Sequence, residues 1–284
     1  MNKIQFLDGA IGSELIIRGE TLPPHIWSAK INLTNPNLLL NIYKEYIKAG
    51  SNYITTNTFR ATPRAYKKIG LTDIEATKTA KKSMQSAIKI AQKAAGNSVK
   101  VLASIAPLED CYIPGDFPGP NIAKKEFSLL INWFEKTKID GYILETMNNI
   151  LETKICLEAI NNSSHPIWVS FNLLDSNHIQ SGEKLEDAIN MVSNFNVDYL
   201  LLNCNSLNRT QDALKIISKK CFQWGIYPNL GRGEPSPDAI INEYASDEEF
   251  LLLCKKAIDL GASIIGGCCG TSPRHIKLLT DNFI

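Results

Sequence analysis

The feature that most constrains the fold is an alternation, repeated eight times along the chain, of a short apolar run with a longer amphipathic segment. Runs of this length are typical of strands buried on both faces of a sheet. We expect the strands at Ile4–Leu7, Tyr53–Thr55, Val99–Ser104, Tyr142–Leu144, Ile167–Phe171, Tyr199–Leu202, Gln223–Tyr227 and Ser263–Ile265. Eight strand–helix units predict an α/β protein with the (β/α)8 TIM-barrel architecture.

The segments between these strands carry helix-boundary signals. Asn35 and Pro36 supply an N-cap and a first-turn proline, and Ala49–Gly50 ends that helix. Thr72 and Glu75 form a capping box for a longer helix. Its expected inner face consists of Ile74, Ala80, Met84, Ala87, Ile88 and Ala91. Further helices are expected near Lys124–Thr137, Ile150–Asn161, Lys184–Asn194, Asn208–Lys219 and Asp247–Leu260, and after Thr271–Pro273.

The length and composition favour one domain over residues 1–284. A chain of 284 residues with 44% hydrophobic content can bury a full core, and α/β barrels of this size commonly form a single domain. No linker or low-complexity tract divides it. A doubly wound open sheet is the alternative, but no Gly-x-Gly-x-x-Gly follows the first expected strand.

Charge and cysteine usage limit the partners and the compartment. The 30 Lys and Arg residues nearly balance the 29 Asp and Glu residues without a dense basic stripe, which argues against nucleic acid and favours small-molecule substrates. No apolar run approaches the roughly 18 residues of a membrane helix. The odd count of seven cysteines, two of them adjacent, predicts a reducing compartment and a cytoplasmic protein. The oligomeric state is left open.

Polar residues follow most of the expected strands, and a barrel brings such strand ends to one mouth. The residues expected there are Asp8, Asn57, Ser104, Glu145, Asn172, Cys204, Asn229, Cys268 and Cys269. Two long loops border them. The first, Pro107–Pro120, is interpreted as a substrate-covering lid, and the second runs through Asn229, Gly231 and Pro237.

Three cysteines at strand ends indicate a metal site. Cys268 and Cys269 follow two glycines after the eighth strand, and Cys204 follows the sixth. Three thiolates with one open position suit a catalytic Zn²⁺, whereas a structural four-cysteine site more usually has C-x₂-C pairs. Cys111, a lone loop cysteine, is not expected to be a ligand.

A zinc ion with three thiolate ligands carries a net charge near −1, so it is better suited to holding a further thiolate than to activating water. Coordination deprotonates a thiol and leaves it nucleophilic at neutral pH. Methyl transfer from a cationic sulfur or nitrogen donor to a substrate thiol is the chemistry implied. If that thiol belongs to an amino acid, Asp8 and Glu145 are candidates for its ammonium group, although a strand-end glutamate in an ordinary ion pair is the alternative for Glu145.

The chain resembles the zinc-dependent homocysteine S-methyltransferases, which include S-methylmethionine and betaine enzymes and the homocysteine module of cobalamin-dependent methionine synthase. The motifs that carry the resemblance are Asp8-Gly-Ala-Ile-Gly-Ser-Glu-Leu15, Ala49-Gly-Ser-Asn-Tyr-Ile-Thr-Thr-Asn-Thr-Phe59, Glu145-Thr146, Asn203-Cys204 and Gly266-Gly-Cys-Cys-Gly-Thr271. It implies that Cys204, Cys268 and Cys269 bind zinc, that Asp8 and Glu145 contact the homocysteine amino group, and that Asn203 belongs to the substrate site. No catalytic residue beyond the zinc site is implied.

Three departures from the family pattern bear on the methyl donor. Many sulfonium-using members have Gly-Pro-Tyr-Gly where this chain has Ser104–Tyr112, and Leu201 stands where a glycine often precedes the Asn-Cys pair. The chain also lacks the C-terminal extension of the betaine enzymes. The last departure favours an S-methylmethionine-type donor over betaine.

Two other functions stay open on the sequence alone. In one, Gly266–Gly267 and the following helix bind a phosphate ligand in a barrel enzyme of another class. In the other, the protein binds zinc or a thiol without catalysis.

Overall fold

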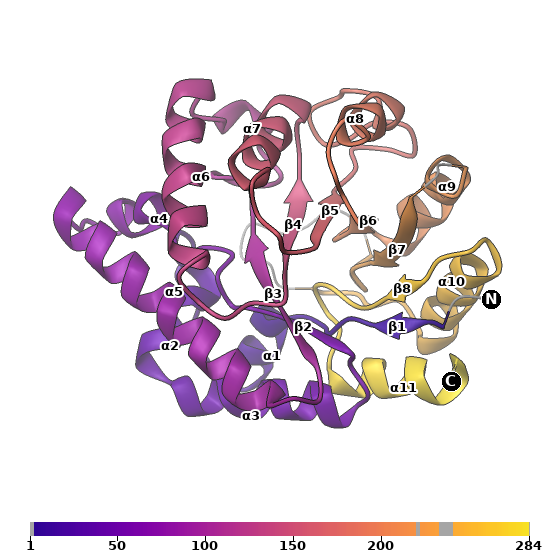
Figure 1. Cartoon of the computed structure of the whole chain (residues 1–284). Helices are drawn as coiled ribbons and strands as arrows, with labels where there is room; N and C mark the ends of the chain where they lie inside the picture. The colour runs from indigo at the N-terminus through magenta and orange to yellow at the C-terminus, as the bar shows by residue number, and fades with distance from the viewer. Residues whose placement is uncertain (1–2, 220–221, 233–240, 284) are drawn as a thin grey trace.

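The computed structural model describes residues 3–219, 222–232 and 241–283, and in these residues eight parallel strands form one sheet that curls into a nearly closed barrel. Figure 1 shows the strands at the centre and the helices around them. The strands are β1 (Gln5–Phe6), β2 (Tyr53–Thr55), β3 (Lys100–Ile105), β4 (Gly141–Met147), β5 (Ile167–Phe171), β6 (Tyr199–Asn203), β7 (Gln223–Tyr227) and β8 (Ile264–Ile265). The predicted TIM barrel is confirmed.

The barrel is closed between β1 and β2 by side chains as well as by the backbone. The Asn52 amide N–H donates to the Phe6 carbonyl at 2.7 Å, and the Phe6 N–H donates to Asn52 Oδ1 at 2.8 Å. One step further along, the Thr55 N–H donates to Asp8 Oδ2 at 2.9 Å. Asp8 therefore helps to close the barrel at the end of the strands where the predicted site lies.

The helices follow the strands in the expected alternation. They are α1 (Ile11–Ile17), α2 (Ile31–Thr34), α3 (Pro36–Lys48), α4 (Pro63–Lys68), α5 (Asp73–Ala95), α6 (Pro120–Phe134), α7 (Ile150–Ile160), α8 (Leu185–Val192), α9 (Leu207–Ile217), α10 (Asp247–Asp259) and α11 (Pro273–Phe283), with 3₁₀ turns η1 (Trp27–Lys30) and η2 (Pro114–Asp116). The N-cap at Asn35 and the capping box of Thr72 and Glu75 are present as predicted.

Several elements differ from the prediction. Helices α1, α2 and α4 were not predicted, because they are too short to show a helical period. Ile74 is 82% exposed rather than buried, since at 3.6 residues per turn it falls outside the buried stripe that contains Ala76, Ala80 and Met84. Part of the predicted loop after β7, including Pro237, lies outside the described residues.

Two apolar layers support the site, one inside the barrel and one between the sheet and the surrounding helices. Side chains inside the barrel form one buried cluster of Leu7, Leu102, Ile143, Trp168, Leu201, Tyr227 and Ile264. Trp168 packs between Tyr53 and Tyr199, with ring centroids 4.7 and 4.5 Å away. The larger cluster lies between the sheet and the helices. Because the interior is filled, any ligand must bind above it, at the carboxyl ends of the strands, here called the barrel mouth.

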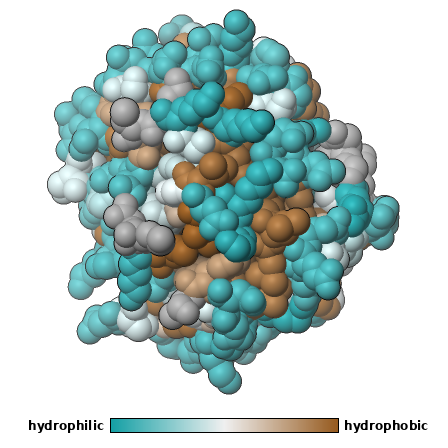
Figure 2. Space-filling model, turned by 90° about the vertical axis from the view of Figure 1, so that its right-hand side faces the viewer, coloured by the Kyte–Doolittle hydropathy of each residue, from teal (hydrophilic) through white to brown (hydrophobic). Residues whose placement is uncertain are grey.

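The outer surface contains both hydrophilic and hydrophobic residues. Figure 2 shows one side of the molecule, on which hydrophilic residues form most of the outline and hydrophobic residues gather toward the centre. Among the helices of the described residues, none combines the length and the apolar character that crossing a bilayer requires.

Candidate active site

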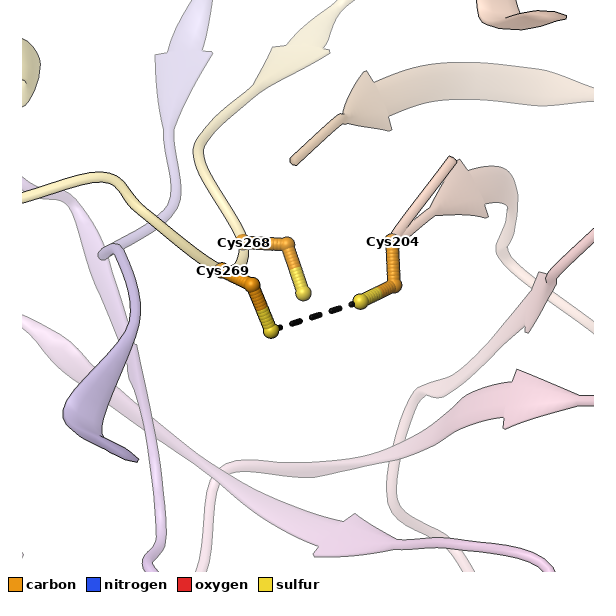
Figure 3. A group of neighbouring side chains, drawn as sticks. All are labelled: Cys204, Cys268 and Cys269. Carbon is orange, nitrogen blue, oxygen red and sulfur yellow. Dashed lines mark hydrogen bonds between the residues drawn. The ribbon is translucent and has the colours of Figure 1, made fainter. Parts of the chain in front are cut away.

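Three cysteine side chains meet at the barrel mouth and form what is called here the thiol cluster: Cys204, Cys268 and Cys269. Cys204 follows β6 directly, and the other two follow β8 after Gly266 and Gly267. The three Sγ atoms lie within 4.8 Å of one another, and the Sγ atoms of Cys204 and Cys269 are 3.6 Å apart. Figure 3 shows their side chains pointing toward one another from the two strand ends. The expected convergence is present, and the cluster is able to bind a metal ion.

The backbone at Cys204 is held in an unusual conformation. Its φ is +55°, a left-handed value that non-glycine residues seldom adopt. The Cys204 N–H donates to the Tyr227 carbonyl at 3.2 Å, and Asn229 Nδ2 donates to the Cys204 carbonyl at 3.0 Å. These bonds to the end of β7 stabilise a turn that directs the thiol toward β8. Strain of this kind is typical of functional sites.

The glycines before Cys268 allow a close approach of the chain. A Cβ at Gly267 would lie 2.4 Å from Thr271 Oγ1, and one at Gly266 would lie 2.7 Å from Leu7 Cβ. Thr271 Oγ1 in turn donates to the Cys268 carbonyl at 2.7 Å. The Gly-Gly pair is therefore explained by packing around the cysteine turn.

The same segment is poorly suited to phosphate. The Gly266 N–H donates to Ile226, the Gly267 N–H to Asp8 and the Cys268 N–H to Pro228, each to a carbonyl oxygen at 3.2 Å or less. A phosphate site needs backbone N–H groups that point at the ligand. These three are already used, which counts against the phosphate-binding alternative.

Protons are shared unequally within the thiol cluster. Hydrogen bonds from Cys204 and Cys268 hold the pKa of Cys269 well below its usual value. Because a thiolate, not a thiol, is the metal ligand, Cys269 is the member most readily prepared for an incoming cation.

Asp8 directly follows β1 and is buried, with 2% of its surface exposed. One carboxylate oxygen accepts the Thr55 N–H, and the Thr55 hydroxyl lies 3.4 Å from the other. Burial raises the pKa of Asp8 well above its usual value. A buried carboxyl group of this kind favours a cationic partner, which would restore its charged form.

Glu145 is directed into the mouth by an irregularity in β4. The strand continues past it to Met147, later than predicted, with a register shift between Leu144 and Met147, and Thr146 has a φ of +51°. Such a bulge re-aims side chains. The Ser104 hydroxyl donates to Glu145 Oε1. Burial nevertheless raises the pKa of Glu145 to about 7.

Asn203, the last residue of β6, is fixed in one amide orientation. Its Oδ1 accepts the Thr146 N–H at 2.9 Å and the Ser170 hydroxyl at 2.6 Å. Its Nδ2 is buried and has no hydrogen-bond partner in the described structure. A buried donor without a partner is costly, so this N–H group is available to a ligand acceptor.

Above these groups lies a cavity of about 810 Å³, called here the mouth cavity. Among the residues expected at the mouth, it is lined by Asp8, Asn57, Ser104, Glu145, Cys204, Asn229, Cys268 and Cys269, and Asn203 also lines it. Asn172 is not among the described lining residues, and its Nδ2 instead donates to the Cys111 carbonyl at 3.2 Å. Its predicted position at the mouth was therefore wrong, because its amide fixes a loop.

The loop fixed by Asn172 is the predicted lid, Pro107–Pro120, and hydrogen bonds attach it to the surrounding structure. Asp110, Cys111, Tyr112 and Ile113 line the cavity, and the Tyr112 hydroxyl is 3.2 Å from Cys204 Sγ. Side chains of α7 and of the surrounding loops bind its backbone. These contacts are Glu152 with Leu108 N–H, Asn148 with the Asp110 and Cys111 carbonyls, and Gln180 with the Tyr112 carbonyl. The loop covers the site as a fixed wall of the cavity.

Cys111 lies in this wall but outside the thiol cluster. Burial raises its pKa to about 12, so it stays protonated at neutral pH. This is consistent with the expectation that it is not a metal ligand.

Sequence reasoning missed several lining residues, above all Trp27 and Arg60. Trp27 has a φ of +45°, and its indole packs where a Cβ on Gly12 would lie 2.6 Å from Nε1. The available signals were a tryptophan in a proline-rich stretch and an arginine directly after the Thr-Asn-Thr-Phe segment.

The fold and the site together define a class of protein, namely a TIM barrel whose mouth cavity is lined by a three-thiol, metal-competent cluster and by the carboxyl groups of Asp8 and Glu145. A family model described as homocysteine S-methyltransferase matches residues 5–283. The chain therefore belongs to the homocysteine S-methyltransferase family.

Individual relatives agree with this assignment. The chain is 27% identical to the homocysteine S-methyltransferase of Escherichia coli over 302 residues, covering 97% of this chain and 94% of that protein. It is 26% identical to homocysteine S-methyltransferase 1 of Arabidopsis thaliana (96% and 91%) and 25% identical to a selenocysteine methyltransferase of Astragalus bisulcatus (95% and 89%). The metallated form of the homocysteine methyltransferase MmuM from Escherichia coli superposes with a TM-score of 0.82 at 25% identity, covering 99% and 96%.

Proposed function

We propose that this protein transfers a methyl group from a cationic donor to the thiol of homocysteine, giving methionine, with Zn²⁺ bound by Cys204, Cys268 and Cys269. The observation that carries the proposal is the thiol cluster, which shares one cavity with the carboxyl groups of Asp8 and Glu145. Membership of the homocysteine S-methyltransferase family and the relatives named above support it.

The donor set fits zinc. Three sulfur atoms within 4.8 Å of one another, at the edge of an open cavity, match the preference of Zn²⁺ for tetrahedral sulfur ligands with one position left for a substrate. When bound, Zn²⁺ would supply deprotonation of the substrate thiol at neutral pH.

The remaining polar groups suit the amino-acid end of homocysteine. Asp8 is a buried and Glu145 a partly buried carboxyl group, and an ammonium group between them would stabilise their charged forms. The free N–H of Asn203 is a donor for an acceptor atom of the substrate. We therefore assign Asp8, Glu145 and Asn203 to homocysteine binding and treat residues 1–284 as one homocysteine-binding domain.

The aromatic part of the cavity lining suits a cationic methyl donor. Trp27 and Tyr112 line the cavity, and aromatic faces attract cations. In the transfer, the homocysteine sulfur forms a bond to the methyl carbon while the bond from that carbon to the donor sulfur breaks, and its electron pair stays on the departing thioether. We favour an S-methylmethionine-type sulfonium over betaine because a neutral thioether leaves more readily than a tertiary amine.

Metal analysis tests the zinc assignment. Protein purified under reducing conditions, as a cytoplasmic location would provide, is expected to hold about one zinc per chain, and Cys204→Ser is expected to hold far less. Cys254→Ala is the matched control, because Cys254 is buried in α10 away from the mouth cavity. Wild-type protein that stays zinc-free after anaerobic reconstitution would refute the metal assignment.

Activity is tested separately with zinc-loaded protein. Homocysteine with S-methylmethionine, S-adenosylmethionine or betaine is offered, and methionine is measured. Selenocysteine is offered as a competing acceptor, because one relative is a selenocysteine methyltransferase. Homocysteine binding without methionine formation from any donor would instead support a non-catalytic thiol-binding protein.

A further inference from the structure

Arg60 places a positive charge in the mouth cavity that the proposed chemistry does not use. It directly follows Phe59, five residues after the end of β2, is partly buried and lines the cavity. Its Nη1 donates to the carbonyl oxygens of Pro107 at 3.1 Å and Glu109 at 2.8 Å. The guanidinium carbon lies 4.9 Å from the centre of the Phe59 ring. The side chain is thus held in place by neutral groups.

No carboxylate among the described residues pairs with this guanidinium. The other arginine that lines the cavity, Arg232, is bound by Glu249 at 2.5 Å and lies 3.5 Å from Glu243. Arg64, close to Arg60 in sequence, is bound by Glu109 and Glu126. Within the described residues, Arg60 Nε and Nη2 also have no hydrogen bond. Arg60 therefore presents unused donors to whatever occupies the cavity, and its charge acts on Glu152 through space without an ion pair or hydrogen bond between them.

The nearest acidic side chains are already engaged. Asp110 accepts the backbone N–H of Tyr112 at 2.8 Å, and Glu152 accepts the backbone N–H of Leu108 and the side-chain amide Nδ2 of Asn149. A guanidinium with free N–H groups binds carboxylates strongly and often through two bonds. The missing partner is thus expected to be a carboxylate that arrives with a ligand.

We propose that Arg60 binds the carboxylate of the methyl donor and so selects donors that are themselves amino acids or betaines over simple sulfonium ions. The position of the two carbonyl groups that hold Arg60 indicates that its ligand is the donor rather than homocysteine. Pro107 and Glu109 belong to the loop whose Tyr112 covers Cys204, whereas Asp8 and Glu145 lie at the strand ends below. This inference rests on the proposed methyl transfer, since it assigns one end of the donor in the same cavity.

The test pairs two probes that differ only in this carboxylate, S-methylmethionine and its methyl ester. Binding of each to zinc-loaded protein is measured by calorimetry without homocysteine, and the KM of each is measured with saturating homocysteine. Arg60→Met is expected to weaken the binding of S-methylmethionine by about ten- to a hundredfold, the usual effect of losing a hydrogen bond to a charged group. The affinity for the methyl ester should stay nearly unchanged. Arg60→Lys should restore part of the loss.

Arg232→Met is the matched control, because it removes a cavity-lining positive charge that already has carboxylate partners. Thermal unfolding of each variant verifies that it is folded. The assignment would be overturned if Arg60→Met weakened the binding of both probes equally, or if it raised only the KM for homocysteine. If no donor supports turnover, the proposed function fails, and the calorimetric comparison of the two probes still decides whether Arg60 binds the carboxylate.

Discussion

Ser104→Ala is expected to weaken homocysteine binding near neutral pH by changing the ionisation of Glu145. The Ser104 hydroxyl donates to Glu145 Oε1, and this bond stabilises the charged carboxylate and lowers its pKa. Burial acts in the opposite direction and is the larger effect, so the pKa of Glu145 is about 7. Removing the hydroxyl removes the lowering contribution and moves the pKa further up.

The size of the effect follows from that balance. A hydrogen bond to a charged group contributes about 1.5 kcal/mol, which corresponds to about one pKa unit, so the pKa of Glu145 would rise to about 8. At pH 7 the ionised fraction would then fall from about one half to about one tenth, and the KM for homocysteine would rise about fivefold. At pH 9 both proteins are ionised and the ratio approaches 1, whereas at pH 6 it approaches about tenfold.

The assay is the KM for homocysteine from pH 6 to 9 at saturating donor, expressed at each pH as the ratio of variant to wild type. The ratio cancels the ionisation of the substrate itself. Ser170→Ala is the control, since its hydroxyl donates to the neutral amide oxygen of Asn203 and its ratio should not vary with pH. A Ser104→Ala ratio that is flat across this range would refute the reasoning.

Two further predictions concern stability. Gly12→Ala would place a Cβ 2.6 Å from Trp27 Nε1, so the variant should lose about 1–3 kcal/mol of unfolding free energy and raise the donor KM, while Gly115→Ala, with no atom within 4 Å, should change neither. Burial raises the pKa of Glu152 to about 7 in the folded protein from an ordinary value of 4.5, so the folded state binds the extra proton and stability should increase as the pH falls from 8 to 5. Chemical denaturation should show a gain of about 3 kcal/mol from this residue, and Glu152→Gln should reduce the slope. An unchanged slope in that variant would contradict the assignment.

Much of the architecture could be predicted because it depends on local signals. Strands β2, β5 and β7 have the predicted bounds, and the capping box at Thr72 is present. The strand ends can also be located from the sequence, which predicts Asp8, Cys204 and Cys268 at one mouth. In a barrel, parallel strands force their carboxyl ends together, and sequence position then becomes spatial position.

What lay outside local signals could not be predicted. Glu145 enters the mouth through a register shift in β4, and Asn172, at the end of β5, binds a loop instead of facing the cavity. Trp27 and Arg60 come from connecting segments whose paths depend on packing against other segments. A loop side chain acquires its neighbours only from the folded whole.

The sequence by itself determined the eight-fold alternation, the helix caps and the chemical types available at the strand ends, because each depends on residues close together in the chain. Only the tertiary structure decided that three thiols lie within 4.8 Å of one another, that the barrel closes through Asn52 and Asp8, and that Arg60 lacks a carboxylate partner among the described residues. These are contacts between distant segments. Their distances and charge balance are set by the packing of the whole barrel.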